Sequence, residues 1–255
     1  LNLIKKDNFI HDKIEFEASL NIFDFLFENK FKKIYKNIRA TTKKNFLEKL
    51  KLITKKNISI QKNSPIFKAL DEIEKLKLKN IFLKKSCFGE LKIEDNLKLL
   101  KLCKKYGTFN FSILARHGFI AEIFLRSLEN NILSSKEISL FKSSIKTVSS
   151  EITDLIQNIA KKSCKTKFLN SYGHIRQSAY DVESPKYSEL IQDIYVKQKR
   201  KKTLNKKFKL NNRQKKLIEK NLKKISLPNI SAEDFLIYLS TGIKAREYGK
   251  LIFTQ

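Results

Sequence analysis

Apolar residues recur at three- and four-residue intervals along most of this chain, with Lys, Glu and Asn between them. This spacing places apolar side chains on one face of an α-helix, which repeats every 3.6 residues. The clearest example follows Ser134, where Ser134-Ser135-Lys136-Glu137 predicts a capping box and apolar positions continue as far as Ile159. The sequence therefore predicts an all-α, multi-helix fold.

The same spacing predicts the other helices and the breaks between them. Glycine (6) and proline (3) are scarce, which favours long helices with short connections. We expect a connection over residues 81–90 and a break at Tyr106-Gly107-Thr108. The expected helices cover residues 15–57 (one helix or a broken pair), 65 onward from a Ser64 cap, 95–105, 109–131, 134–159, 165–170, 189–202, 212–224 and 231 to the end.

Length and hydrophobic content indicate a folded chain. With 255 residues, 41% of them hydrophobic and 19 Phe, the chain can bury a substantial core. We expect two helical parts, residues 1–107 and 108–255. No run of eighteen apolar residues is present, so we expect no membrane span and a cytoplasmic location. Because the chain starts at Leu1 and contains no Met, we expect it to be a fragment of a larger multidomain protein.

A formal net charge of +28 raises the question of a polyanionic partner. Nearly all of the positive charge is Lys, which is spread along the chain, whereas bidentate recognition of phosphates favours Arg. We therefore expect solvated lysines and no nucleic-acid partner. A basic helical module that binds nucleic acid or another polyanion without catalysis is the alternative.

Several catalytic and metal-binding signatures are missing from the sequence. We find no glycine-rich phosphate loop followed by Lys-Ser/Thr, no His-Glu-x-x-His, no Gly-x-Ser-x-Gly and no paired cysteines that could hold a metal. The three cysteines are widely spaced, which favours reduced thiols. We expect no metal site and no self-contained catalytic apparatus.

The segment 171–187 differs from the rest of the chain because it lacks helical spacing and concentrates His, Arg, Asp, Gly, Pro and Tyr. His174 and Arg176 are two residues apart, so in an extended segment they project to the same side. Such a pair could clamp a carboxylate or phosphoryl oxygen. By contrast, we expect His117 to be a hydrogen-bonded core residue on an apolar helix.

A structural role for this segment is an equally open alternative. Arg176 and Asp181 could pair with each other, or with Glu122 and Arg126, and so fasten the loop between helices. Its tyrosines, Tyr180 and Tyr187, would then be core aromatics.

The segment resembles a known family. Tyr172-Gly173-His174-Ile175-Arg176, then Tyr180-Asp181 and Ser184-Pro185-Lys186-Tyr187, is similar to the YGHLRPGTYDI-SPRY signature of phosphoenolpyruvate synthase-like proteins. These are related to pyruvate phosphate dikinases and rifampin phosphotransferases, and the resemblance covers residues 108–255. Gln177-Ser178-Ala179 replace the family's Pro-Gly-Thr, and Lys186 replaces an Arg, which removes one bidentate cation.

The resemblance implies a three-part phosphotransferase. An ATP-grasp domain phosphorylates a histidine on a swivelling domain, which carries the phosphoryl group to or from a substrate such as pyruvate. This chain resembles the helical central region, which is expected to be inactive alone and to contain no catalytic residue or cofactor. ATP and Mg²⁺ are implied for the parent enzyme, whose ATP-grasp and phosphohistidine domains are expected partners together with a small-molecule phosphoryl acceptor.

The resemblance also implies which side chains meet the acceptor. The candidate substrate-binding residues are His174, Arg176, Tyr180, Asp181, Arg116 and Arg126. His174 is not the carrier histidine, which in the family belongs to a separate domain.

Overall fold

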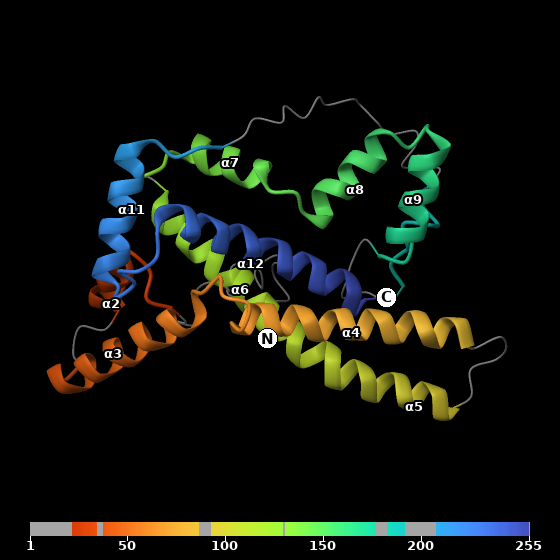
Figure 1. Cartoon of the computed structure of the whole chain (residues 1–255), viewed down its shortest axis with the longest axis horizontal. Coiled ribbons are helices and arrows are strands. Elements are labelled where there is room, and N and C mark those ends of the chain that lie inside the picture. Colours follow the sequence, from red (N-terminus) through yellow and green to blue (C-terminus); the bar gives the residue numbers. More distant parts are fainter. Residues whose placement is uncertain are drawn as a thin grey trace. The chain divides into compact units, whose positions relative to one another are not determined.

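The computed structural model describes residues 22–34, 38–86, 93–129, 131–176, 183–191 and 208–254. Within these ranges the regular structure is helical, and the β contacts are two isolated bridges, which confirms the predicted all-α class. The helices in Figure 1 are α2 (Phe27–Ile34), α3 (Ala40–Asn57), α4 (Pro65–Ser86), α5 (Ile93–Leu102), the π-helix η1 (Cys103–Thr108), α6 (Phe109–Leu128), α7 (Ser135–Ser144), α8 (Val148–Gln157), α9 (Lys162–Tyr172), α11 (Asn212–Lys224) and α12 (Ala232–Phe253).

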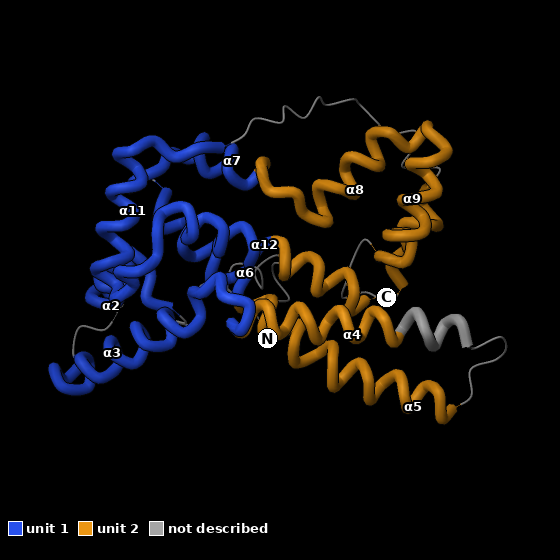
Figure 2. Tube along the Cα trace, viewed as in Figure 1, with its two compact units in different colours: residues 1–64, 117–142, 208–243 blue, residues 65–116, 143–207, 244–255 orange. Residues whose placement is uncertain are grey.

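The chain forms two compact units, each assembled from three separate segments (Figure 2). Unit 1 comprises residues 1–64, 117–142 and 208–243, and unit 2 comprises residues 65–116, 143–207 and 244–255. Helices α6 and α12 each contribute residues to both units. The division into residues 1–107 and 108–255 stays a prediction.

Unit 1 is built around aromatic side chains from α6 and α12. The rings of Phe124 and Phe235 meet edge to face at 5.1 Å, and Phe25 packs on both. Beside this cluster, the Nδ1 of His117 lies 2.8 Å from the hydroxyl of Tyr238, and both side chains are buried. The prediction that His117 is a hydrogen-bonded core histidine is therefore confirmed.

Unit 2 has an apolar core to which α4, α6, α8, α9 and α12 contribute buried side chains. Helix α4 begins at Pro65 as predicted, and its Ile66, Ala69 and Ile73 are buried in this core. The remaining buried members come from α6, the α8–α9 region and α12: Leu114, Leu155, Ile159, Phe168, Tyr172, Ala245, Leu251 and Ile252. This core holds α8, α9 and the end of α12 together, and the candidate site lies among them.

The predicted break at Tyr106-Gly107-Thr108 is wrong, because the helix continues through these residues as η1. Gly107 is buried, and a Cβ added to it would lie 2.9 Å from the ring of Phe253 and 3.1 Å from Leu76. Glycine here permits close packing of the helix against its neighbours, so its presence does not end the helix.

Two further sequence predictions need correction. Helix α4 extends through Ser86, so residues 81–86 are helical rather than a connection. The helix predicted over residues 134–159 is two helices, α7 and α8, because Thr147 caps a new helix with Ser150 in a capping box. The Ser134 capping box itself is confirmed, since Glu137 accepts hydrogen bonds from the backbone and hydroxyl of Ser134.

Other predicted elements agree with the structure. Residues 27–34 and 40–57 form two helices, in agreement with a broken pair, α9 covers the predicted residues 165–170, and α11 has the predicted bounds. Ser231 caps α12 by accepting a hydrogen bond from the backbone N–H of Asp234. The helix expected at 189–202 falls largely outside the described residues. Among the helices described, none is long and apolar enough to cross a membrane.

Candidate functional site

A cavity of about 340 Å³ lies in unit 2, and we call it the α8–α12 cavity. It is bounded by the first turn of α8, by the segment that follows α9 and by the last turns of α12. The lining residues are Val148, Ser149, Ile152, His174, Ile175, Arg176, Tyr187, Glu247, Lys250, Leu251 and Thr254.

The end of α9 brings His174 to this cavity. Tyr172 is buried at the end of the helix, and its hydroxyl hydrogen-bonds the carboxylate of Glu151 on α8. Glu151 also binds Lys167, with Nζ 2.7 Å from Oε1. Hydrogen bonds from Lys167 and Tyr172 lower the pKa of Glu151, while burial and the Glu151 bond raise that of Tyr172. These contacts fix the last turn of α9 immediately before His174.

Gly173 makes the turn that follows α9. Its N–H donates to the carbonyl of Leu169 at 3.0 Å, and an added Cβ would lie only 2.5 Å from that carbonyl oxygen. The close approach explains why a glycine precedes His174.

Residues 173–176 then pair with residues 184–188 as two short antiparallel segments. The N–H of Tyr187 donates to the carbonyl of Ile175 at 2.9 Å, and Arg176 forms an isolated bridge with Lys186. The guanidinium of Arg176 donates to the carbonyl of Ser184. Backbone pairing and the hydrogen bond to Ser184 therefore set the position of Arg176. The guanidinium has five N–H donors, so others are available to bind a ligand.

His174 and Arg176 both line the α8–α12 cavity, and both side chains are half-buried. Tyr187 lines the same cavity, and its ring packs 5.8 Å from the ring of Phe168 in the core of unit 2. The segment thus combines both roles considered from the sequence, because Tyr187 is a packed aromatic while the His-Arg pair borders a cavity.

The cavity lining also includes residues that the sequence did not single out for a role. Ser149 lies in the first turn of α8, and its backbone N–H donates to Oε2 of Glu247 at 2.8 Å. Lys250, one turn further along α12, is exposed at the cavity edge. A sequence signal was present, since Ala245-Arg246-Glu247-Tyr248 and Lys250 are within the stretch that carries the family resemblance.

The charged groups at this cavity leave a surplus of positive charge. Arg176 and Lys250 are cations, and Glu247 is the one carboxylate in the lining. The Glu247 carboxylate accepts from the amino-terminal turn of α8, where unpaired N–H groups favour negative charge. The arrangement suits a small ligand with a carboxylate or phosphoryl group.

Arg116 and Arg126, two of the other predicted site residues, do not line this cavity. Arg116 is exposed on α6 in unit 2, and Arg126 is on the part of α6 that belongs to unit 1. Arg126 lies 3.6 Å from Glu122, which also binds Lys142. Tyr180 and Asp181 lie outside the described residues.

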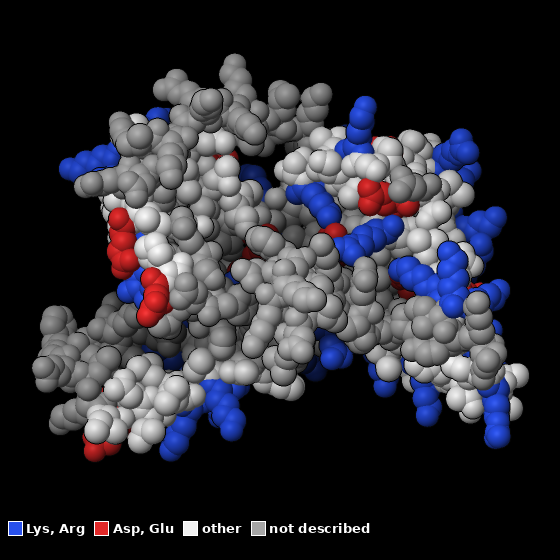
Figure 3. Space-filling model, turned by 180° about the vertical axis from the view of Figure 1, so that it is seen from behind, with Lys and Arg blue, Asp and Glu red and all other residues white. Residues whose placement is uncertain are grey.

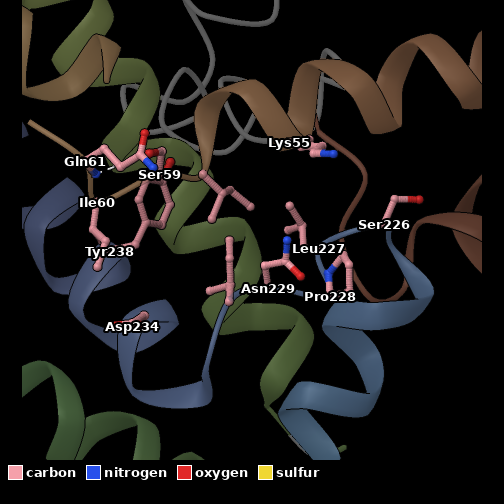
Figure 4. A pocket seen from close by; sticks show the side chains of 12 residues that line it. Lys55, Ser59, Ile60, Gln61, Ser226, Leu227, Pro228, Asn229, Asp234 and Tyr238 are labelled. Atoms are coloured by element: carbon pink, nitrogen blue, oxygen red, sulfur yellow. Dashed lines mark hydrogen bonds between the residues drawn. The ribbon is translucent and has the colours of Figure 1, made fainter. Parts of the chain in front are cut away.

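Unit 1 has a second cavity, of about 370 Å³, between the loop 58–61 and the loop 226–230 (Figure 4). Its apolar side includes Ile58 and Leu227, and Tyr238 and Asp234 reach it from α12. Asp234 accepts a hydrogen bond from Ser231, and the other charged group is Lys55. With one charge of each sign, this cavity has no preference for an anion.

Neither cavity is lined by a described cysteine. Cys103 and Cys164 are free thiols and are half-buried. In the part of the chain that the structure describes, no group of three His, Cys, Asp or Glu side chains could hold a metal ion.

Comparisons with family models, with curated proteins and with solved structures each gave no match.

Proposed function

We propose that this chain is the central substrate-binding region of a phosphoenolpyruvate synthase-like phosphotransferase, inactive alone. The α8–α12 cavity would hold the anionic part of the phosphoryl acceptor. One observation carries the proposal: the segment that resembles the family places His174 and Arg176 on a cavity whose charge is positive on balance. His174 and Arg176 are the two residues that belong both to the family-like segment and to the lining of this cavity.

Each polar group has a specific part in this proposal. Arg176 binds a carboxylate or phosphoryl oxygen through its planar donors, and Lys250 adds a second cation at the cavity edge. His174 donates a hydrogen bond to the ligand when protonated. All three are binding residues, because the phosphoryl group arrives from a histidine on another domain, where ATP and Mg²⁺ are also bound.

Calorimetric titration of the 255-residue chain with phosphoenolpyruvate, pyruvate and inorganic phosphate tests the proposal. We expect saturable binding, and R176A should weaken it at least about tenfold because it removes a charge-assisted hydrogen bond. Arg116→Ala is the matched control, since it removes an exposed arginine of unit 2 that does not line the cavity. Equal losses in both variants, or no binding to the parent chain, would contradict the proposal.

The distribution of lysine favours a second candidate, a basic module that binds a polyanion. Helices α3 and α11 of unit 1 carry many exposed cations: Lys44, Lys49, Lys55, Lys56, Arg213, Lys216, Lys220, Lys223 and Lys224. Figure 3 shows Lys and Arg outnumbering Asp and Glu over the described part of one face. Micromolar binding to random duplex DNA with a steep loss on adding salt would support this function.

A further inference from the structure

We propose that helix α5 pairs two copies of this chain in an antiparallel arrangement. None of the described residues of α5 is buried. Three of its aliphatic side chains are strongly exposed: Ile93 by 79%, Leu97 by 51% and Leu100 by 66%. These positions are separated by four and three residues, so they form one stripe along the helix. An apolar stripe of this kind on a helix is typical of a contact surface.

The charges beside the stripe indicate what covers it. Glu94 and Lys101 are both exposed and are seven residues apart, so they lie on the same flank of the stripe. With Leu97 at an a position and Ile93 and Leu100 at d positions, both charges occupy e positions of a heptad.

The direction of pairing follows from these e positions. When two identical helices run antiparallel, the same flank of each helix meets across the seam, so e faces e of the partner. In this register, Leu97 of one copy contacts Leu100 of the second copy, and Glu94 of the first copy lies opposite Lys101 of the second. The two-fold symmetry of the dimer forms this ion pair twice. In a parallel pair e faces g, and the g position within this stretch is the uncharged Asn96.

The distribution of charge along α5 supports the same direction. Acidic residues Glu94 and Asp95 occupy the first turn of α5, and Lys101 lies in the last turn. Antiparallel pairing brings the acidic end of one helix to the basic end of the other.

The size of the contact sets the expected strength. Three aliphatic side chains per copy form less than a standard interface, and the chain carries a formal charge of +28. Repulsion between charges farther apart than about 8 Å is largely screened at physiological ionic strength. The Glu94–Lys101 pairs beside the contact are closer and are screened less. We therefore expect a weak dimer, with a dissociation constant on the order of 100 µM.

Sedimentation equilibrium of the 255-residue chain at fixed ionic strength, from about 10 to about 500 µM, measures this association. Leu97→Gln should weaken it at least about tenfold without changing the net charge. Leu52→Gln is the matched control, because Leu52 is a comparably exposed leucine (53%) on α3, outside the stripe. Circular dichroism establishes that both variants keep their helix content.

A charge exchange tests the direction of pairing. E94K and K101E should each weaken the dimer, because each places like charges opposite one another. The double variant E94K/K101E restores both pairs and should recover the parent affinity. Failure of the double variant to recover overturns the antiparallel arrangement.

Two other results would overturn the self-association itself. One is a chain that stays monomeric over the whole concentration range. The other is a stripe that binds vesicles of anionic lipid, with binding lost in Leu97→Gln, while the chain in solution stays monomeric.

Discussion

Glu247 of α12 accepts a hydrogen bond from the backbone N–H of Ser149, in the first turn of α8, at 2.8 Å. This contact joins two elements of unit 2 that are about one hundred residues apart in the sequence. It also sets a carboxylate on the wall of the α8–α12 cavity, where it offsets part of the charge of Arg176 and Lys250. If the cavity binds an anion as proposed, we expect Glu247 to lower its affinity.

Substitution of Glu247 by Gln should strengthen anion binding. The amide oxygen can still accept from Ser149, but the negative charge facing the ligand is gone. We expect affinity for phosphoenolpyruvate to rise by about threefold to tenfold, measured by calorimetry. Glu247→Ala also removes the acceptor, so it should lower the free energy of unfolding by about 1 kcal/mol. Weaker anion binding in the Gln variant would contradict the charge argument.

Ser226→Gly should stabilise the protein. Ser226 has a φ of 67°, in the left-handed region that favours glycine. It occupies the C′ position of a Schellman motif that ends α11, in which Leu227 donates to Leu222 and Ser226 to Lys223. We expect the free energy of unfolding to rise by about 0.5–1 kcal/mol in urea titrations. Ser226→Ala is the control and should bring no such gain, because alanine has the same steric conflict.

Tyr238→Phe should destabilise unit 1. The hydroxyl of Tyr238 is hydrogen-bonded to Nδ1 of His117 at 2.8 Å, and both residues are buried. Removing this partner leaves a buried ring nitrogen without that bond, at a cost of about 1–3 kcal/mol. Thermal unfolding followed by circular dichroism measures the loss. Tyr187→Phe is the comparison, since its half-buried ring can keep its packing, and an equal loss there would contradict the assignment.

Acidification should weaken the contact between α7 and α11. The pKa of Glu137 lies below its ordinary value because the carboxylate accepts three hydrogen bonds. The donors are the Ser134 backbone, the Gln214 side chain and the Ser134 hydroxyl. Because its pKa is lower in the folded state, Glu137 stabilises the fold above about pH 4.5, and this contribution is lost as pH falls through the folded-state pKa. The difference in unfolding free energy between the parent chain and E137Q should shrink on acidification. A difference independent of pH would contradict this role.

Local signals in the sequence were sufficient to predict several elements. The cap at Ser231, the start at Pro65 and the bounds of α11 follow from residues within a single turn of each helix end. The error at Gly107 arose because tertiary packing decides there. Gly107 looks like a helix terminator in sequence, but its missing side chain makes room for Phe253, which is almost 150 residues away.

The candidate site was predictable only in part, for the same reason. His174 and Arg176 are close in sequence, and their shared cavity followed from the pairing of residues 173–176 with 184–188. Glu247 and Lys250 reach the cavity through the packing of α12, which no local spacing reveals. Arg116 and Arg126 lie on the same helix but belong to different units. The sequence alone does not show which unit each arginine belongs to.

The binding of a small anion in the α8–α12 cavity is most directly tested by NMR of the histidine side chains. The chain has three histidines, His11, His117 and His174, so their imidazole resonances can be resolved and assigned by substitution. During titration with phosphoenolpyruvate, we expect the His174 resonances to shift and saturate while those of buried His117 stay in place. Saturation should be lost in R176A. An unchanged His174 signal at millimolar ligand, or a shift that sodium chloride reproduces at the same ionic strength, would contradict the account.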